Sequence, residues 1–321
     1  MGKKRLKLGR VFLSMVLITG TIFVADSLRR DFFTSDTLTL KVNGDFRDSS
    51  DKSLEAPSED SQILNDTGLS TTEFQGVQHL GYSEINLSES KLSEGLLSIV
   101  KENYPVEEID KSDMVDLLDY KNEYYTLVSE SIKLNIDAAE ALNEMMMDYS
   151  AATGLYDFVV YGTTETYTGE GSYCPKYFPE SAIGNCVDLA VNGYGSVIAY
   201  DGYDAESWVI ENCHKYGFIV RCPVGKSSFT SNEFCPWHLR YVGEVHSAIM
   251  AEKNYCLEEY VSFISAYTFD YPLTYSANGV NYEIYGAKAT GEFTAVRVPV
   301  SGNYTISGNN IDGFIITVVK N

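Results

Sequence analysis

A long polar segment near the N-terminus limits where this chain can build a folded core. Residues 31–75 carry ten acidic and three basic side chains and contain no Tyr, Trp or Cys. Such a segment cannot bury enough apolar surface to offset the entropy lost on ordering, so we expect a disordered acidic stalk. The folded part is therefore expected to begin near residue 76.

A basic cluster and an apolar run precede this stalk. Five Lys or Arg residues lie within the first ten positions, and the apolar run extends from Val11 to Ala25. In a helix at about 1.5 Å per residue, this run is shorter than the roughly 30 Å membrane core. Residues 1–30 are therefore predicted to be a signal peptide or a signal anchor, and the bulky Phe23 before the cleavage position favours an anchor. The basic flank predicts an extracytoplasmic protein, membrane-anchored or secreted.

Charge and cysteine content narrow the classes of partner and compartment. The formal net charge of −21 argues against nucleic acid as a partner, because nucleic-acid binding needs clustered Lys and Arg. All six cysteines lie between Cys174 and Cys256, and none forms a C-x-x-C pair. Outside the cell they could form disulfides, and buried thiols are an equally open alternative.

Hydrophobic spacing predicts one long helix and several short elements. Apolar residues recur at intervals of three and four between Ala139 and Tyr149, with Asn135 as a candidate N-cap and Gly154 just past the end. Short β-runs are expected at residues 96–100, 158–160, 187–191 and 218–220. Further helices are expected at residues 204–216 and 243–264, the latter with a break near Asn254.

After residue 268 the pattern changes to short β-type runs separated by glycines. These runs are residues 282–285, 294–300 and 314–319. The sequence therefore predicts an α+β protein, with a small antiparallel sheet flanked by helices over residues 76–268. A small β appendage is predicted for residues 269–321.

The most informative motif lies at residues 236–243, which read P-W-H-L-R-Y-V-G. This run resembles the VanY-type D-alanyl-D-alanine carboxypeptidases, whose pattern here is E-P-W-H-x-R-Y-V-G. Residues 179–188, P-E-S-A-I-G-N-C-V-D, resemble the family's S-x-H-x-x-G-x-A-x-D in the glycine and the aspartate. Residues 161–165 align with its S-G-Y-R-S segment. The resemblance covers roughly residues 95–268 and implies the zinc peptidase fold.

The resemblance also implies a catalytic zinc, and several functional positions depart from the family pattern. The family holds zinc by His, Asp and His, leaving one position open for water. This chain offers Asp188 and His238, but Ser181 replaces the first His. Cys235 replaces the family's catalytic Glu, and Thr164 replaces an Arg suited to a substrate carboxylate. The positions expected to line the substrate pocket are Ser181, Thr164, Trp237, Arg240 and Tyr241.

These departures leave two functional hypotheses. In the first, the chain is a cell-envelope protein that contacts peptidoglycan stem peptides, with lost or much reduced hydrolysis. In the second, it is an active metallo-carboxypeptidase that uses a rewired zinc site of Asp188, Cys235 and His238. Cys235 could also be a small filling residue or part of a disulfide. Asp188 and His238 could be purely structural, and His214 and His246 are expected to be packing or surface residues.

Overall fold

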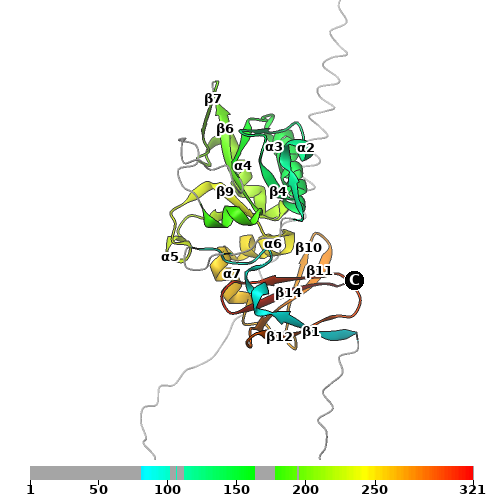
Figure 1. Ribbon diagram of the computed structural model, residues 1–321. Coiled ribbons are helices and arrows are strands. Elements are labelled where there is room, and N and C mark those ends of the chain that lie inside the picture. Colours follow the sequence, from blue (N-terminus) through cyan, green and yellow to red (C-terminus); the bar gives the residue numbers. More distant parts are fainter. Residues whose placement is uncertain (1–80, 102–105, 107–111, 163–177, 194, 321) are drawn as a thin grey trace, which may run out of the picture. The chain divides into compact units, whose positions relative to one another are not determined.

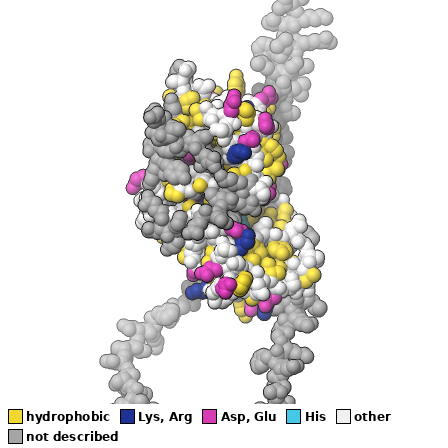
Figure 2. Space-filling view, viewed as in Figure 1, with side chains coloured by type: hydrophobic (Ala, Val, Ile, Leu, Met, Phe, Trp, Pro, Cys, Tyr) yellow, Lys and Arg dark blue, Asp and Glu magenta, His cyan; other side chains and the backbone are white. Residues whose placement is uncertain are grey.

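The computed structural model describes residues 81–101, 106, 112–162, 178–193 and 195–320. The N-terminal segment, the stalk, His79, Thr164 and Cys174 lie outside this range. Within it, no helix is both long and apolar enough to cross a membrane. On the face shown in Figure 2, Asp and Glu side chains are scattered over the surface and do not form one cluster.

The central sheet carries the two motifs that the sequence singles out. Its strand order is β3-β5-β6-β9-β8, with β7 paired to β6, and only the β3–β5 pair is parallel. The strands are β3 (Thr126–Leu127), β5 (Phe158–Gly162), β6 (Cys186–Gly193), β7 (Ser196–Ala199), β8 (Phe218–Cys222) and β9 (Cys235–Tyr241). The central position of β6 and β9 explains why both strands are almost fully buried.

Helix α3 (Ile136–Thr153) packs on this sheet and confirms the predicted helix and both of its ends. The Asn135 side chain accepts hydrogen bonds from the backbone N–H groups of Asp137 and Ala138, and Gly154 ends the helix in the left-handed conformation. Leu142 and other buried residues of α3 pack against the apolar side chains of β5 and β6. A short sheet and helix precede α3: β2 (Met114–Asp116), α2 (Leu117–Tyr120) and β4 (Lys133–Asn135).

Two helices connect the central sheet to the C-terminal strands. Helix α6 (Glu244–Lys253) packs against β8 and β10, and α7 (Leu257–Ile264) packs against β11 (Figure 1). The predicted break falls at Asn254, whose φ of 53° ends α6. The C-terminal sheet has the order β10-β11-β14-β13, from β10 (Leu273–Ala277), β11 (Val280–Lys288), β13 (Tyr304–Gly308) and β14 (Gly313–Lys320).

The predicted α+β class with C-terminal strands is confirmed, and the β-region also draws on an earlier part of the chain. Strand β1 (Tyr82–Ser88), followed by the 3-10 helix η1 (Glu89–Ser93), pairs antiparallel with β12 (Phe293–Pro299). The C-terminal β-region is therefore built from both ends of the described chain.

Two local predictions were wrong. Residues 97–100 are buried as expected but form no strand, because side chains and loop backbone satisfy their polar groups: Ser307 Oγ accepts from the Leu97 N–H. Residues 204–216 are not one helix. They form η3 (Asp204–Glu206), α4 (Ser207–Asn212) and η4 (Cys213–Tyr216) in succession.

A buried ion-pair network at the candidate metal site

Asp188 and His238 meet at the centre of the sheet. The register of β6 against β9 places the two residues directly opposite each other. His238 Nδ1 lies 2.6 Å from Asp188 Oδ1, and the side chains are almost completely buried. The register between β8 and β9 shifts just before this point, between Val220 and Cys222. Such bulges re-aim side chains next to functional sites, and this one lies beside His238.

Ser181 and Cys235 occupy the other two family positions, and both are buried. Ser181 lies on the 3-10 helix η2 (Pro179–Ile183), and its Oγ has no hydrogen-bond partner in the described part of the chain. Cys235 Sγ donates to the Glu233 carbonyl at 3.2 Å. The Cys235 side chain packs in a small cluster with Phe178, whose ring stacks on His238 at a centroid distance of 4.0 Å.

Glu180, which the sequence analysis did not select, is the centre of the charged network. Its Oε2 accepts from Arg221 Nε at 2.8 Å and from Arg240 Nη1 at 2.6 Å. Its Oε1 lies 3.4 Å from His238 Nε2, a contact without hydrogen-bond geometry. One carboxylate therefore faces two guanidinium groups and the imidazole.

The network extends from Glu180 toward α7 and toward residues 96–101. Arg221 donates two further hydrogen bonds to Glu258, at 3.1 and 2.7 Å, and Lys101 lies 3.0 Å from the same carboxylate. Arg240 donates to the carbonyls of Leu96 and Ser98 at 3.0 and 2.6 Å. The network thus joins β8 and β9 to α7 and to residues 96–98.

The electrostatics of this network favour the charged forms of its members. Burial alone would raise the pKa of Glu180, but Arg221, His238 and Arg240 outweigh it and hold that pKa far below its usual range. Burial likewise favours a neutral His238, but Asp188 raises the pKa of this imidazole well above its ordinary value. We therefore treat His238 as an imidazolium that donates from Nδ1 to Asp188.

Of the remaining predicted pocket residues, one is fully buried and two are half-buried. The Arg240 side chain is 0% exposed, so it supports the site from within and does not line a pocket. Trp237 and Tyr241 are half-buried, and the Tyr241 ring meets Phe218 edge-on at 5.4 Å. Burial raises the pKa of Tyr241 to about 12, so its hydroxyl stays protonated near neutral pH.

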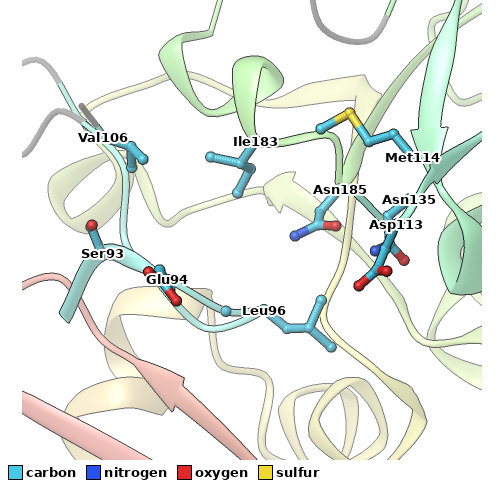
Figure 3. Close-up of a pocket in the computed structure, with 10 residues that line it drawn as sticks. Ser93, Glu94, Leu96, Val106, Asp113, Met114, Asn135, Ile183 and Asn185 are labelled. Carbon is cyan, nitrogen blue, oxygen red and sulfur yellow. The ribbon is translucent and has the colours of Figure 1, made fainter. Parts of the chain in front are cut away.

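A cavity lies beside this site without including its charged centre. It has a volume of about 190 Å³, and Figure 3 shows its lining residues, among them Leu96, Asp113, Ile183 and Asn185. Asp188, Ser181 and His238 do not line this cavity. All three residues are buried, at 5%, 3% and 0% exposure respectively.

The residues present do not fit a catalytic zinc in the family's arrangement. Two tetrahedral ligand atoms about 2.0–2.1 Å from one zinc lie roughly 3.3 Å apart, farther than the 2.6 Å between His238 Nδ1 and Asp188 Oδ1. Ser181 offers a neutral hydroxyl as the third donor.

A second donor set shares His238. Within the described residues, the group of acidic, Cys and His side chains that could surround an ion is Glu180, Cys186 and His238, with donor atoms within 4.8 Å of one another. The structure thus does not bring Cys235 together with Asp188 and His238 as the rewired hypothesis expected. It places Cys186, at an alanine position of the family pattern, beside His238.

Comparisons with known proteins agree with the motif and extend it. A family model described as VanY, D-alanyl-D-alanine carboxypeptidase, matches residues 182–244. A D-alanyl-D-alanine carboxypeptidase of Enterococcus faecium is 33% identical over 246 residues, covering 73% of this chain and 78% of that protein. The chain belongs to the D-alanyl-D-alanine carboxypeptidase family. A second relative, from Enterococcus faecalis (strain ATCC 700802 / V583), is 28% identical over 138 residues and covers 43% of this chain and 48% of its own length.

The fold agrees with this membership. The structure is similar to that of the vancomycin resistance D,D-dipeptidase VanXYg in complex with a D-Ala-D-Ala phosphinate analog. The two are 26% identical with a TM-score of 0.62, over 74% of this chain and 99% of that one. Within this shared fold, Glu180 is the residue that motif reasoning missed. Its signal in the sequence was an acid directly before the altered ligand position Ser181.

Proposed function

We propose that this chain is a family member with lost or much reduced hydrolysis, which binds peptidoglycan stem peptides at the cell envelope. The observation that carries the proposal is the direct 2.6 Å contact between Asp188 and His238 inside a closed set of matched charges. A buried charge costs several kcal/mol unless it is paired, and here each carboxylate has a cationic partner. The protonated imidazole supplies positive charge where the family pattern implies a metal.

The loss of the catalytic base position supports the same proposal. A positioned carboxylate that takes a proton from water typically contributes about 10²–10⁴-fold to a rate. Cys235 stands at that position, and its Sγ donates a hydrogen bond to the Glu233 carbonyl. A thiol held in this way does not replace a carboxylate base.

Family membership and the N-terminal sequence support the proposed ligand and location. The related VanXYg structure contains a D-Ala-D-Ala analog, which is a ligand of the same chemical class as a stem-peptide end. Trp237 is half-buried, packs against the cluster of Phe178, Cys222 and Cys235 next to the altered site, and offers an aromatic surface for such a peptide. The basic and apolar N-terminal segment supports an extracytoplasmic protein, membrane-anchored or secreted, with the acidic stalk between membrane and folded part.

One alternative is an active metallo-carboxypeptidase with a changed ligand set. It is favoured by the group of Glu180, Cys186 and His238. Carboxylate, thiolate and imidazole are all zinc ligands. Zinc that displaces one proton from Cys186 and one from His238 would leave the net charge of the network unchanged. Against this, Glu180 already accepts hydrogen bonds from two guanidinium groups, which repel a further cation.

Peptide binding and hydrolysis by the full-length protein test the proposal. We expect no release of D-alanine from a pentapeptide ending in D-Ala-D-Ala, and binding of the same peptide by calorimetry. Binding should weaken in Trp237→Ala and remain in Tyr304→Ala, a variant in the C-terminal sheet. Release of D-alanine that Cys186→Ser abolishes would favour the alternative, whereas absence of both binding and release would remove the proposed ligand.

A restored variant tests the assignment of the site itself. The triple variant Thr164→Arg, Ser181→His and Cys235→Glu returns the family residue at each altered position. We expect it to bind zinc and to gain D-alanine release relative to the unmodified chain. The double variant without Ser181→His is the matched control, because it still lacks the third ligand. Equal behaviour of the triple and double variants would contradict the assignment of Ser181.

A further inference from the structure

Two cysteines face each other across the strand pair that carries the altered site. Cys222, the last residue of β8, lies opposite Cys235, the first residue of β9. Directly opposed residues of antiparallel strands have Cα atoms about 4.5–5.5 Å apart, and their side chains project from the same face. Disulfides span Cα separations of about 4.4–6.8 Å, so this register suits a covalent bond.

The packing around the pair places the two side chains in one buried cluster. Both side chains are buried, at 0% and 5% exposure, in one cluster with Phe178. The proximity of Cys235, together with burial, raises the pKa of the Cys222 thiol. The two cysteines are therefore neighbours in the reduced protein, opposite each other in the strand register and within one packed cluster.

The other described cysteines have different surroundings. Cys186 donates to the Glu180 carbonyl, Cys213 donates to the Ile210 carbonyl, and Cys256 caps helix α7. In the strand registers, Cys186 lies opposite Arg240. Among the described residues, Cys222 and Cys235 are the two cysteines that lie opposite each other. The cross-strand arrangement thus distinguishes Cys222 and Cys235 from the rest.

We propose that Cys222 and Cys235 are a modification site that forms an intramolecular disulfide by exchange with a small-molecule disulfide. The Cys235 thiolate attacks one sulfur of the reagent and expels a thiolate, leaving a mixed disulfide. The Cys222 thiolate then attacks Cys235 Sγ and expels the second. The two cysteines lose two electrons and two protons, and the reagent is reduced to two thiols. Cys235 reacts first because it is the more exposed of the two cysteines, at 5% against 0% for Cys222.

The bond would fix the chain at the position where the family places its catalytic base. It would tie the end of β8 to the start of β9 and enclose the segment that contains α5 (Ser227–Thr230). A disulfide sulfur can neither accept a proton from water nor ligate a metal as a thiolate. Formation of the bond in the cell depends on the proposed extracytoplasmic location, whereas formation in vitro depends on the geometry alone.

Peptide mapping of the full-length protein tests the site directly. The reduced protein is incubated with oxidised glutathione, blocked with N-ethylmaleimide in denaturant and digested. We expect a peptide pair linked through Cys222 and Cys235, and a loss of two reactive thiols from the six in the sequence. The Tm should rise by roughly 5–10 °C, because the bond closes a short loop in the unfolded chain.

Single variants provide the controls. Cys213→Ala and Cys256→Ala should still lose two thiols and form the same linked peptide. Cys222→Ala should form no intramolecular bond and should instead carry glutathione on Cys235. Six reactive thiols after oxidation of the unmodified protein would overturn the proposal, as would a linked peptide that joins Cys174 to either residue. Neither result bears on the proposed loss of hydrolysis, which is tested by the release of D-alanine.

Discussion

Two buried histidines show how differently one residue type is used in the two halves of this molecule. His238, in the central sheet, lies between the carboxylates of Asp188 and Glu180. His246, on α6, contacts Tyr260 OH at 2.6 Å and Thr317 Oγ1 at 3.1 Å. Both side chains are buried, yet their pKa values move in opposite directions. Charge raises the pKa of His238, whereas burial lowers the pKa of His246 to about 4.

The comparison teaches that burial alone does not decide the charge of a side chain. His246 is neutral because burial penalises the charged imidazole. Two hydroxyl groups contact the neutral ring, which can donate from one nitrogen and accept at the other. His238 is charged because carboxylates face it and guanidinium groups balance the second carboxylate. The first histidine is an ordinary core residue. The second belongs to a charge network at the place where the family pattern implies a metal.

The largest expected effect comes from removing the centre of that network. Glu180→Gln leaves Arg221 and Arg240 buried without their shared carboxylate. We expect the free energy of unfolding to fall by about 3–5 kcal/mol, measured by urea denaturation at pH 7. Glu283→Gln, which breaks the more exposed pair with Lys320, should cost less than about 1 kcal/mol. Equal losses in the two variants would contradict the assignment of Glu180 as the centre.

The next effect is a pH dependence that belongs to His246. The pKa of His246 is lowered in the folded protein. As pH falls below about 6.5, the unfolded chain therefore binds a proton at this imidazole, whereas the folded chain does not. Stability should therefore decrease by about 2–3 kcal/mol between pH 6.5 and pH 4.5.

Parallel titrations of two variants isolate this contribution. His246→Gln should lose most of the slope of unfolding free energy against pH in that range. His214→Gln should retain most of it, since the half-buried His214 has a lowered pKa but remains partly solvated. An unchanged slope in His246→Gln would show that the ring is not held neutral in the folded protein.

The smallest expected effect on stability comes from removing the Tyr260 hydroxyl, which contacts His246. Tyr260→Phe leaves His246 Nδ1 buried without its partner, and we expect a loss of about 1–2 kcal/mol in unfolding free energy. Tyr275→Phe, which removes an exposed hydrogen bond to Glu252, should cost only a few tenths of a kcal/mol by the same measurement. A negligible effect of Tyr260→Phe would mean that another group satisfies the ring.

The sequence predicted the parts of this molecule that depend on local signals. The helix from Ile136 to Thr153 follows from apolar spacing and from the caps Asn135 and Gly154, all of which act within a few residues. The break at Asn254 was likewise visible. The family motif predicted that Asp188 and His238 belong to one site, and the strand register brings them together.

The sequence did not reveal contacts that depend on long-range packing. Glu180, Arg221 and Glu258 lie far apart along the chain, so nothing local indicates that they share one network. The pairing of β1 with β12 joins opposite ends of the described chain and could not be seen in either segment. Residues 97–100 have the apolar composition of a strand, but their backbone partners come from loop side chains and carbonyls.

The most direct test of the central claim is the zinc content of the full-length protein. The protein is dialysed against Zn²⁺ at pH 7, separated from free metal and measured by mass spectrometry, together with Asp188→Ala and Cys186→Ser. If the protonated His238 and its carboxylates form a closed ion-pair network, the unmodified protein should retain far less than one zinc per chain. One zinc per chain in the unmodified protein, lost in either variant, would contradict the account.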